Sequence, residues 1–276
     1  QEDYSFYAVA LLFSVSYKND LNNSIAILPP YIPKDDFEAR LNELKGIKYS
    51  QVEFKGKWEV SAKWRTQDLE TNVLAPSLFL FSSGTTGRPK IMRHNLHDFV
   101  SQYEFTQKQR NRTFLLFLMF DHIGGLNTLM TCLFKGMTVI IPENRNPEHI
   151  AKLCLVHSVH VLPTTPTFLN MLLISGSLSK LRDVKYITYG TERMPESLLG
   201  ELRRALPRTQ LRQSFGLSET GIIQIKQKSQ DSLYFKLDDK DREFRVVNGE
   251  LHVRSKLLVD GYQNHTSNNF LEDGWL

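Results

Sequence analysis

Short apolar runs alternate with amphipathic stretches along most of this chain, and this alternation constrains the fold more than any other feature. The apolar runs have strand length, and the stretches between them carry apolar residues at helical spacing. We expect strands at 76–83, 113–119, 138–142, 160–166, 184–190 and 209–216, and helices at 94–109, 124–136, 146–158, 167–176 and 194–207. This alternation predicts an α/β fold with mostly parallel sheets flanked by helices.

The pattern changes after about residue 220, where the apolar runs become shorter. We expect strands at 222–226, 232–237, 243–255 and 258–263. Asn248-Gly249 is typical of a tight hairpin turn within the third of these. The sequence therefore predicts a large α/β part over residues 1–215 and a β-rich subdomain, an antiparallel meander or small barrel, over 216–276.

The first part of the chain is less informative. We interpret 4–17 as a buried helix opened by Asp3, because it is too short to span a bilayer and lacks the features of a signal peptide. A strand at 24–30 and a helix at 35–46 follow. The chain begins as if within a domain, so we interpret it as a fragment.

Composition excludes several classes of function. The 276 residues carry a net charge of +4 from 34 basic and 30 acidic side chains, and the basic residues are scattered. Nucleic-acid binding is therefore not expected, whereas binding of a small anion is compatible with this charge. Cys132 and Cys154 lie in apolar surroundings without metal-ligand spacing, so we expect two buried thiols in a reducing, cytoplasmic compartment.

A polar loop, SSGTTGRPK, follows the apolar run at 77–81 directly, and we expect it to connect a strand to a helix. Glycines let a ligand approach the backbone, and hydroxyl and cationic groups bind phosphate oxygens. The alternative is a polar surface turn. The candidate phosphate-binding residues are Ser82, Ser83, Gly84, Thr85, Thr86, Gly87 and Lys90.

The spacing within this loop differs from that of kinases and GTPases. Their loop, G-x-x-x-x-G-K-[ST], places the lysine directly after the second glycine. Here two residues separate Gly84 from Gly87, and Pro89 precedes Lys90. A nucleotide site of that type is therefore excluded.

The loop resembles the phosphate-loop signature of the adenylate-forming enzymes, which include acyl-CoA synthetases, luciferases and peptide-synthetase adenylation domains. Four further blocks resemble that family in the expected order: FDHIGGLNTLM, YITYGTERMPESLLGELRRALP, LRQSFGLSETG and the segment from GELHVRS to the end. The resemblance covers about residues 75 to 276. It implies the acetyl-CoA synthetase-like large domain, with ATP, Mg²⁺ and coenzyme A or a pantetheine carrier as cofactors.

The resemblance also implies roles for single residues. Phe215 corresponds to an aromatic that packs on adenine, in the same block as Gly216. Ser218 would contact the α-phosphate, and Glu219 would be a magnesium ligand. Gly190 and Thr191 lie in the block that lines the adenine pocket, although relatives often have two glycines and an alanine there. Glu192 is also compatible with a cap or a solvent-exposed position.

Two registers remain open in the block at 120–130. His122 corresponds to the histidine that acyl-CoA synthetases place near the reacting carboxylate, and Gly124-Gly125 favours this register. Alternatively, Phe120-Asp121 corresponds to the pair with which amino-acid-activating domains hold the substrate ammonium group. The other histidines show no metal-ligand spacing; we place His94 and His97 one turn apart on the helix after the loop.

The resemblance implies a two-step reaction in which Lys90, Glu219 and His122 are the candidate catalytic residues. A carboxylic acid reacts with ATP to give an acyl-adenylate, and a thiol of coenzyme A or an acyl carrier protein then accepts the acyl group. The chain stops before the family's C-terminal lid domain, so we expect poor activity from it alone. The alternatives are an amino-acid adenylation domain, a non-catalytic nucleotide-binding remnant and a plain α/β structural domain.

Overall fold

The computed structural model describes residues 25–26, 35, 40, 49–54, 60–65, 77–82, 90–104, 108, 111–255, 259 and 273–276. The expected helix at 4–17 lies outside these residues, and only 35 and 40 of the expected helix at 35–46 are described, both of them helical. Within the described residues, no helix is both long enough and apolar enough to cross a membrane.

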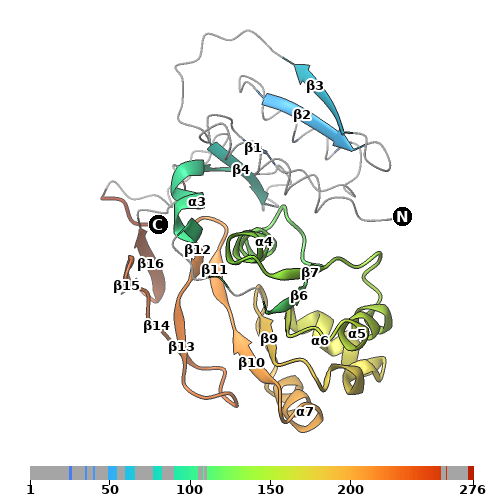
Figure 1. Ribbon diagram of the computed structural model, residues 1–276. Helices are drawn as coiled ribbons and strands as arrows, with labels where there is room; N and C mark the ends of the chain where they lie inside the picture. The colour runs from blue at the N-terminus through green and yellow to red at the C-terminus, as the bar shows by residue number, and fades with distance from the viewer. Residues whose placement is uncertain are drawn as a thin grey trace.

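The largest sheet among the described residues is a five-stranded parallel sheet, which we call the central sheet (Figure 1). Its strands, in spatial order, are β7 (Thr138–Ile140), β6 (Thr113–Leu115), β8 (Val161–Thr164), β9 (Tyr186–Tyr189) and β10 (Gln210–Gln213). Every neighbouring pair is parallel, which confirms the prediction of a mostly parallel sheet. The chain runs outward from β6 to β7 and then returns past β6 to β8. Ligands of open α/β sheets bind at such a reversal of strand order, beyond the carboxyl ends of the strands.

The helices between these strands appear at the expected places. They are α4 (Ile123–Lys135), α5 (Pro147–Val156), α6 (Pro166–Ile174) and α7 (Glu196–Ala205), with a short 3₁₀ helix, η1 (Ser177–Leu181), after α6. Local sequence sets their ends. Asn146 accepts a hydrogen bond from the Glu148 amide at the start of α5, and Gly136 ends α4 with φ = 66°. A side-chain cap and a left-handed glycine satisfy backbone groups that a helix end leaves unpaired.

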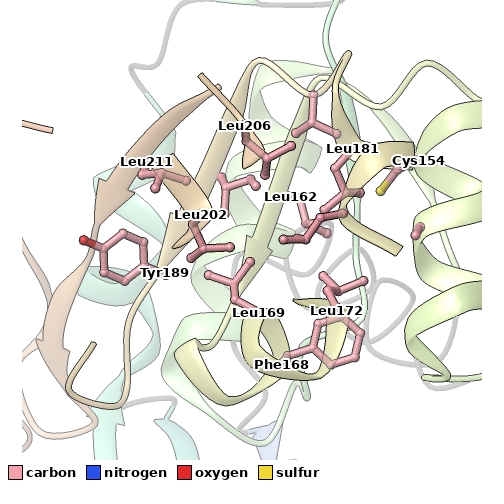
Figure 2. Packing of buried hydrophobic residues seen from close by; sticks show 14 of the residues in the cluster. Cys154, Leu162, Phe168, Leu169, Leu172, Leu181, Tyr189, Leu202, Leu206 and Leu211 are labelled. Atoms are coloured by element: carbon pink, nitrogen blue, oxygen red, sulfur yellow. The ribbon is translucent and has the colours of Figure 1, made fainter. Parts of the chain in front are cut away.

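Two apolar clusters lie on opposite faces of the central sheet. The larger cluster joins the sheet to α5, α6, η1 and α7 through residues such as Leu162, Leu169 and Leu202. Figure 2 shows Tyr189 at the edge of this cluster, with its hydroxyl oxygen pointing away from the leucines. The second cluster joins α4 to α3 (Leu96–Glu104) and to the strands that flank the polar loop. Burial raises the pKa of Cys132 and of Cys154 to about 12, so both thiols are neutral.

The polar loop does not connect a strand to a helix, and this expectation was wrong. β4 (Ser77–Ser82) and β5 (Lys90–Asn95) pair antiparallel, so the loop joins the two strands of a hairpin. The Asn95 side chain accepts hydrogen bonds from the His97 and Asp98 amides, which starts α3 at Leu96. His94 therefore lies buried on β5, whereas His97 lies on α3. α3 is described as far as Glu104; residues 105–107 and 109 of the expected helix lie outside the described residues, and Lys108 is not helical.

Outside the central sheet, the described strands form smaller sheets. β1 (Ile25–Ala26) pairs parallel with β4, and β2 (Tyr49–Phe54) pairs with β3 (Val60–Arg65). The C-terminal part forms three antiparallel pairs: β11 (Phe215–Leu217) with β12 (Gly221–Ile223), β13 (Ile225–Gln227) with β14 (Phe235–Leu237), and β15 (Arg242–Val247) with β16 (Glu250–Ser255).

The predicted turn at Asn248-Gly249 is confirmed. Both residues have positive φ angles, 52° and 84°, as a tight hairpin between twisted strands requires. The expected strand at 258–263 lies outside the described residues except for Val259, which is in no strand.

Candidate nucleotide and acid site

The carboxyl ends of the central strands bring several predicted residues to one edge of the sheet. The segment after β6 leads to His122, and Gly190 and Thr191 follow β9 directly. β10 leads through Ser214 into Phe215 on β11. This is the edge at which the reversal of strand order between β6 and β8 predicts a ligand.

The loops after β9 and β10 touch through their backbones. The Ser214 amide donates a 2.7 Å hydrogen bond to the Tyr189 carbonyl, and a Cβ on Gly190 would lie 2.7 Å from the Ser214 carbonyl oxygen. Gly190 is thus required by the contact between two loops, in the block for which the resemblance implies a role in lining the adenine pocket. Thr191 has φ = 67°, and strained backbone of this kind concentrates at binding sites.

Phe215 and Gly216 lie on β11, the first strand of the next hairpin. The Phe215 ring is half-buried, and its centroid lies 5.3 Å from that of Phe235. A Cβ on Gly216 would lie 2.5 Å from the Gly221 carbonyl oxygen on the partner strand. Gly216 is therefore needed for the pairing of β11 with β12.

Ser218 and Glu219 occupy the tip of this hairpin. The Thr220 amide donates to the Leu217 carbonyl, which closes a turn with Ser218 and Glu219 as its central residues. Gly221 follows with φ = 72°, a left-handed conformation that glycine adopts without strain. Both side chains at the tip are half-buried. A turn of this kind holds a hydroxyl and a carboxylate side by side.

A magnesium ion fits a carboxylate in such a position. Mg²⁺ prefers oxygen ligands and is usually held by one or two carboxylates together with substrate phosphates. Glu219 offers such a carboxylate on a turn whose backbone is fixed. Among the described residues, no group of three or more His, Cys, Asp or Glu side chains could hold a metal ion.

The polar loop is described only at its two ends. Ser82 is the last residue of β4 and lies opposite Lys90, the first residue of β5. The residues between them, which include Ser83, Gly84, Thr85, Thr86 and Gly87, lie outside the described part. Lys90 is half-buried, and its strand packs into the apolar cluster that also contains α4 and the hairpin residue Ile222. This shared cluster connects the elements that carry Lys90, His122 and Glu219.

Asp121 and His122 have opposite exposures. The Asp121 side chain is only 6% exposed, and within the described residues its Oδ1 atom has no hydrogen-bond partner. The His122 side chain is 63% exposed at the position that precedes α4, with its Nε2 atom 3.8 Å from Asp121 Oδ2. The structure thus places a buried carboxylate and an accessible imidazole next to each other.

A row of buried polar residues along this edge was missed by the sequence analysis. Thr164, Tyr189 and Gln213 lie opposite one another at the ends of β8, β9 and β10. The Thr164 Oγ1, Tyr189 hydroxyl and Gln213 Oε1 atoms are buried without a hydrogen-bond partner in the described part of the chain. Burial raises the pKa of Tyr189, an effect that the Gln227 side chain opposes. The available sequence signal was that each of these strands ends on a polar residue.

Arg145 connects two loops at the same edge. Its Nε atom donates a 2.9 Å hydrogen bond to the Phe117 carbonyl, so the segment after β7 holds the segment after β6. That second segment leads to Asp121 and His122. The charged side chain was not singled out from sequence, because its partner is a backbone atom far along the chain.

Solved structures with the same fold confirm the architecture. The chain is similar to a luciferase-like enzyme from the mealworm Zophobas morio with a TM-score of 0.61 and 22% identity, covering 78% of this chain and 55% of that one. At this level of identity, the similarity shows the fold alone.

The curated relatives match this chain over only part of their own length. Indoleacetate–CoA ligase of Aromatoleum aromaticum is 27% identical over 240 residues, which cover 76% of this chain and 45% of the relative. 4-Coumarate–CoA ligase 1 of Narcissus pseudonarcissus is 24% identical, with coverages of 71% and 42%. A dimodular nonribosomal peptide synthase of Bacillus subtilis is 26% identical over 145 residues, with coverages of 50% and 6%. The chain therefore spans less than half the length of these relatives.

The family assignment rests on a match over most of the chain. Residues 34–263 match the family described as AMP-binding enzyme, and this range contains every predicted site residue. The order of the sequence blocks, the parallel sheet and the hairpin at 215–223 agree with that match. The chain belongs to the AMP-binding enzyme family.

Proposed function

We propose that this chain binds ATP and Mg²⁺ and activates a carboxylic acid as an acyl-adenylate, which a thiol then accepts. The observation that carries this proposal is the Ser218–Glu219 turn, held beside the carboxyl edge of a parallel sheet in a chain of the AMP-binding enzyme family. The CoA ligases among the relatives favour coenzyme A as the acceptor, and a carrier-protein pantetheine is the alternative.

The first step needs charge neutralisation rather than covalent chemistry from the protein. A carboxylate oxygen attacks the α-phosphorus of ATP, the bond from that phosphorus to the oxygen bridging to the β-phosphate breaks, and pyrophosphate leaves. Lys90 and the hydroxyl-rich loop would supply cationic and hydrogen-bonding groups for the phosphates, and Glu219 would hold the cation. The magnesium ion, when bound, withdraws charge from the phosphate oxygens.

The second step uses the reactivity of the mixed anhydride that joins the acyl group to AMP. The thiol loses its proton to solvent, its sulphur attacks the acyl carbon, the carbon–oxygen bond to AMP breaks, and AMP leaves with both bonding electrons. His122 is accessible enough to contact either the acid or the thiol, and its ring nitrogens can donate or accept a hydrogen bond.

We expect Glu219→Gln to lower ATP–pyrophosphate exchange by about 10- to 100-fold, because it weakens a cation ligand while keeping the size of the side chain. The measurement is exchange of labelled pyrophosphate with a panel of fatty and aromatic acids. Glu250→Gln, at an exposed carboxylate on β16, is the matched control and should exchange normally. Full activity of the Glu219 variant at limiting Mg²⁺ would contradict the proposal.

Amino-acid activation is a second candidate, favoured by the burial of Asp121. The Asp121 Oδ1 atom has no hydrogen-bond partner among the described residues, and a buried carboxylate in this state is costly unless a cation approaches it. A substrate ammonium group is a suitable cation. In this reading the acid would be an amino acid, and the acceptor thiol would belong to a carrier protein.

The two candidates differ in what Asp121→Asn does. If Asp121 holds an ammonium group, the variant should lose exchange with amino acids by at least about 30-fold, because one partner of a buried charge pair is removed. Exchange with acids lacking an amino group should not fall, and Asp183→Asn, at an exposed carboxylate, is the control. Exchange with fatty or aromatic acids alone in the unaltered protein would exclude this second candidate.

A further inference from the structure

The turn that carries Ser218 and Glu219 is fixed by a side chain from a distant strand. Arg242, the first residue of β15, donates a 2.8 Å hydrogen bond from Nη2 to the Thr220 carbonyl. Its Nη1 atom lies 2.5 Å from Asp239 Oδ2 in an ion pair whose side chains are 5% and 1% exposed. A charged group is therefore buried directly behind the tip of the hairpin.

Asp239 is in turn held by two backbone amides. The Gln224 amide donates to Oδ2 at 2.9 Å, and the Asp241 amide donates to Oδ1 at 3.1 Å. Because Gln224 follows β12 directly, Asp239 and Arg242 together connect the end of β12 with its beginning. A carboxylate fixed by such bonds orients the guanidinium that it binds.

Three backbone groups at the tip have hydrogen-bond partners. The Thr220 amide donates to Leu217, the Glu219 carbonyl accepts from the Val259 amide at 3.0 Å, and the Thr220 carbonyl accepts from Arg242. Arg242 also lies close enough to Tyr103 on α3 for its charge to oppose the effect of burial, which raises the pKa of that tyrosine. The turn is thus bonded to the first residue of β15 and to Val259.

We propose that the buried Asp239–Arg242 pair is a positioning element that aims the Ser218–Glu219 turn at the cation–nucleotide complex. The proposal rests on the proposed function, since it takes Glu219 as the ligand for the cation. The proposal adds that the selectivity for cation-bound over cation-free ATP depends on Asp239 and Arg242, which contact neither the cation nor ATP. Arg242 and Asp239 are positioning residues, because they act through the backbone of Thr220 and Gln224.

The test replaces the pair as a unit, so that no buried charge is left without a partner. Asp239→Leu/Arg242→Met substitutes apolar side chains of similar length, a change that buried ion pairs often tolerate. A matched control exists on α7. Arg203 also pairs with an aspartate, Asp231, and also donates to a threonine carbonyl, that of Thr209, but it lies on another element. Its counterpart variant is Asp231→Leu/Arg203→Met.

ATP affinity is measured by calorimetry in MgCl₂ and again in EDTA. We expect Asp239→Leu/Arg242→Met to lose about 10-fold or more in affinity for Mg·ATP while its affinity for ATP in EDTA is unchanged. The control variant should keep both affinities. Equal losses in the two conditions, or no loss in either, would overturn the proposal.

A second readout separates this proposal from the proposed function. Hydrogen exchange of the Thr220 and Val259 amides, whose bonds hold the turn, should accelerate in Asp239→Leu/Arg242→Met and not in the control variant. Unchanged protection of both amides would overturn the positioning role, whatever the measured affinities for ATP are. If the unaltered protein bound no ATP, the proposed function and the predicted effect on selectivity would both fail. The hydrogen-exchange rates would still show whether the Asp239–Arg242 pair holds the turn.

Discussion

Arg242→Met alone should lower the free energy of unfolding by about 3–5 kcal/mol, because it leaves the Asp239 carboxylate buried without its cation. Asp239 is 1% exposed and cannot turn to water without breaking its bonds to the Gln224 and Asp241 amides. The Thr220 carbonyl loses its partner in the same change. Urea unfolding followed by circular dichroism measures the loss.

Two comparisons make this result specific to the buried pair. Arg204→Met removes an exposed arginine whose partner is Glu201, and such surface pairs contribute about 0.5 kcal/mol. Asp239→Leu/Arg242→Met should recover most of the stability that Arg242→Met loses, because the remaining charge is removed as well. A double variant no more stable than the single one would contradict this account of the loss.

Gly125→Ala should destabilise the protein by about 1–3 kcal/mol and displace the turn that carries Asp121 and His122. A Cβ at this position would lie 2.0 Å from the Met119 carbonyl oxygen and 2.7 Å from its carbonyl carbon. Both are backbone atoms, so no side chain can rotate away. The His122 amide donates to the same carbonyl, which transmits the shift to the candidate site.

The neighbouring glycine provides the control. A Cβ on Gly124 would meet nothing within 4 Å, and alanine favours a helix by up to about 1 kcal/mol over glycine. Gly124→Ala should therefore keep or raise the melting temperature, whereas Gly125→Ala lowers it, as scanning calorimetry would show. Equal melting temperatures for the two variants would contradict a contact at Gly125. Pyrophosphate exchange should fall in the Gly125 variant alone.

Local patterns predicted the central elements because their causes are local. Gly136 ends α4 in a left-handed conformation that glycine adopts without strain, and Asn248-Gly249 forms the tight turn between β15 and β16. The alternation of apolar runs placed the parallel strands and their helices, since each element must bury one face. The sequence blocks that contain Phe215 and Glu219 indicated the family of the chain, and the family match over residues 34–263 confirms that family.

β5 was missed for a reason that is not local. The stretch from Lys90 to Asn95 contains only two adjacent apolar residues that are buried, Ile91 and Met92, and it precedes a helix without a break. It becomes a strand because β4 pairs with it across the loop, and this pairing is a tertiary contact. The expected helix therefore started too early and included His94.

The candidate site shows the same division. The sequence by itself determined which residues are candidates for the chemistry, because a hydroxyl-rich loop, a glutamate in a block that resembles a known family and a glycine after a strand can all be read from the chain. Tertiary structure alone decided that Arg242 is bonded to the carbonyl of Thr220, that Gly125 lies against Met119, and that Thr164, Tyr189 and Gln213 form one row. These contacts depend on burial and on strand register, which arise only when segments distant in sequence pack together.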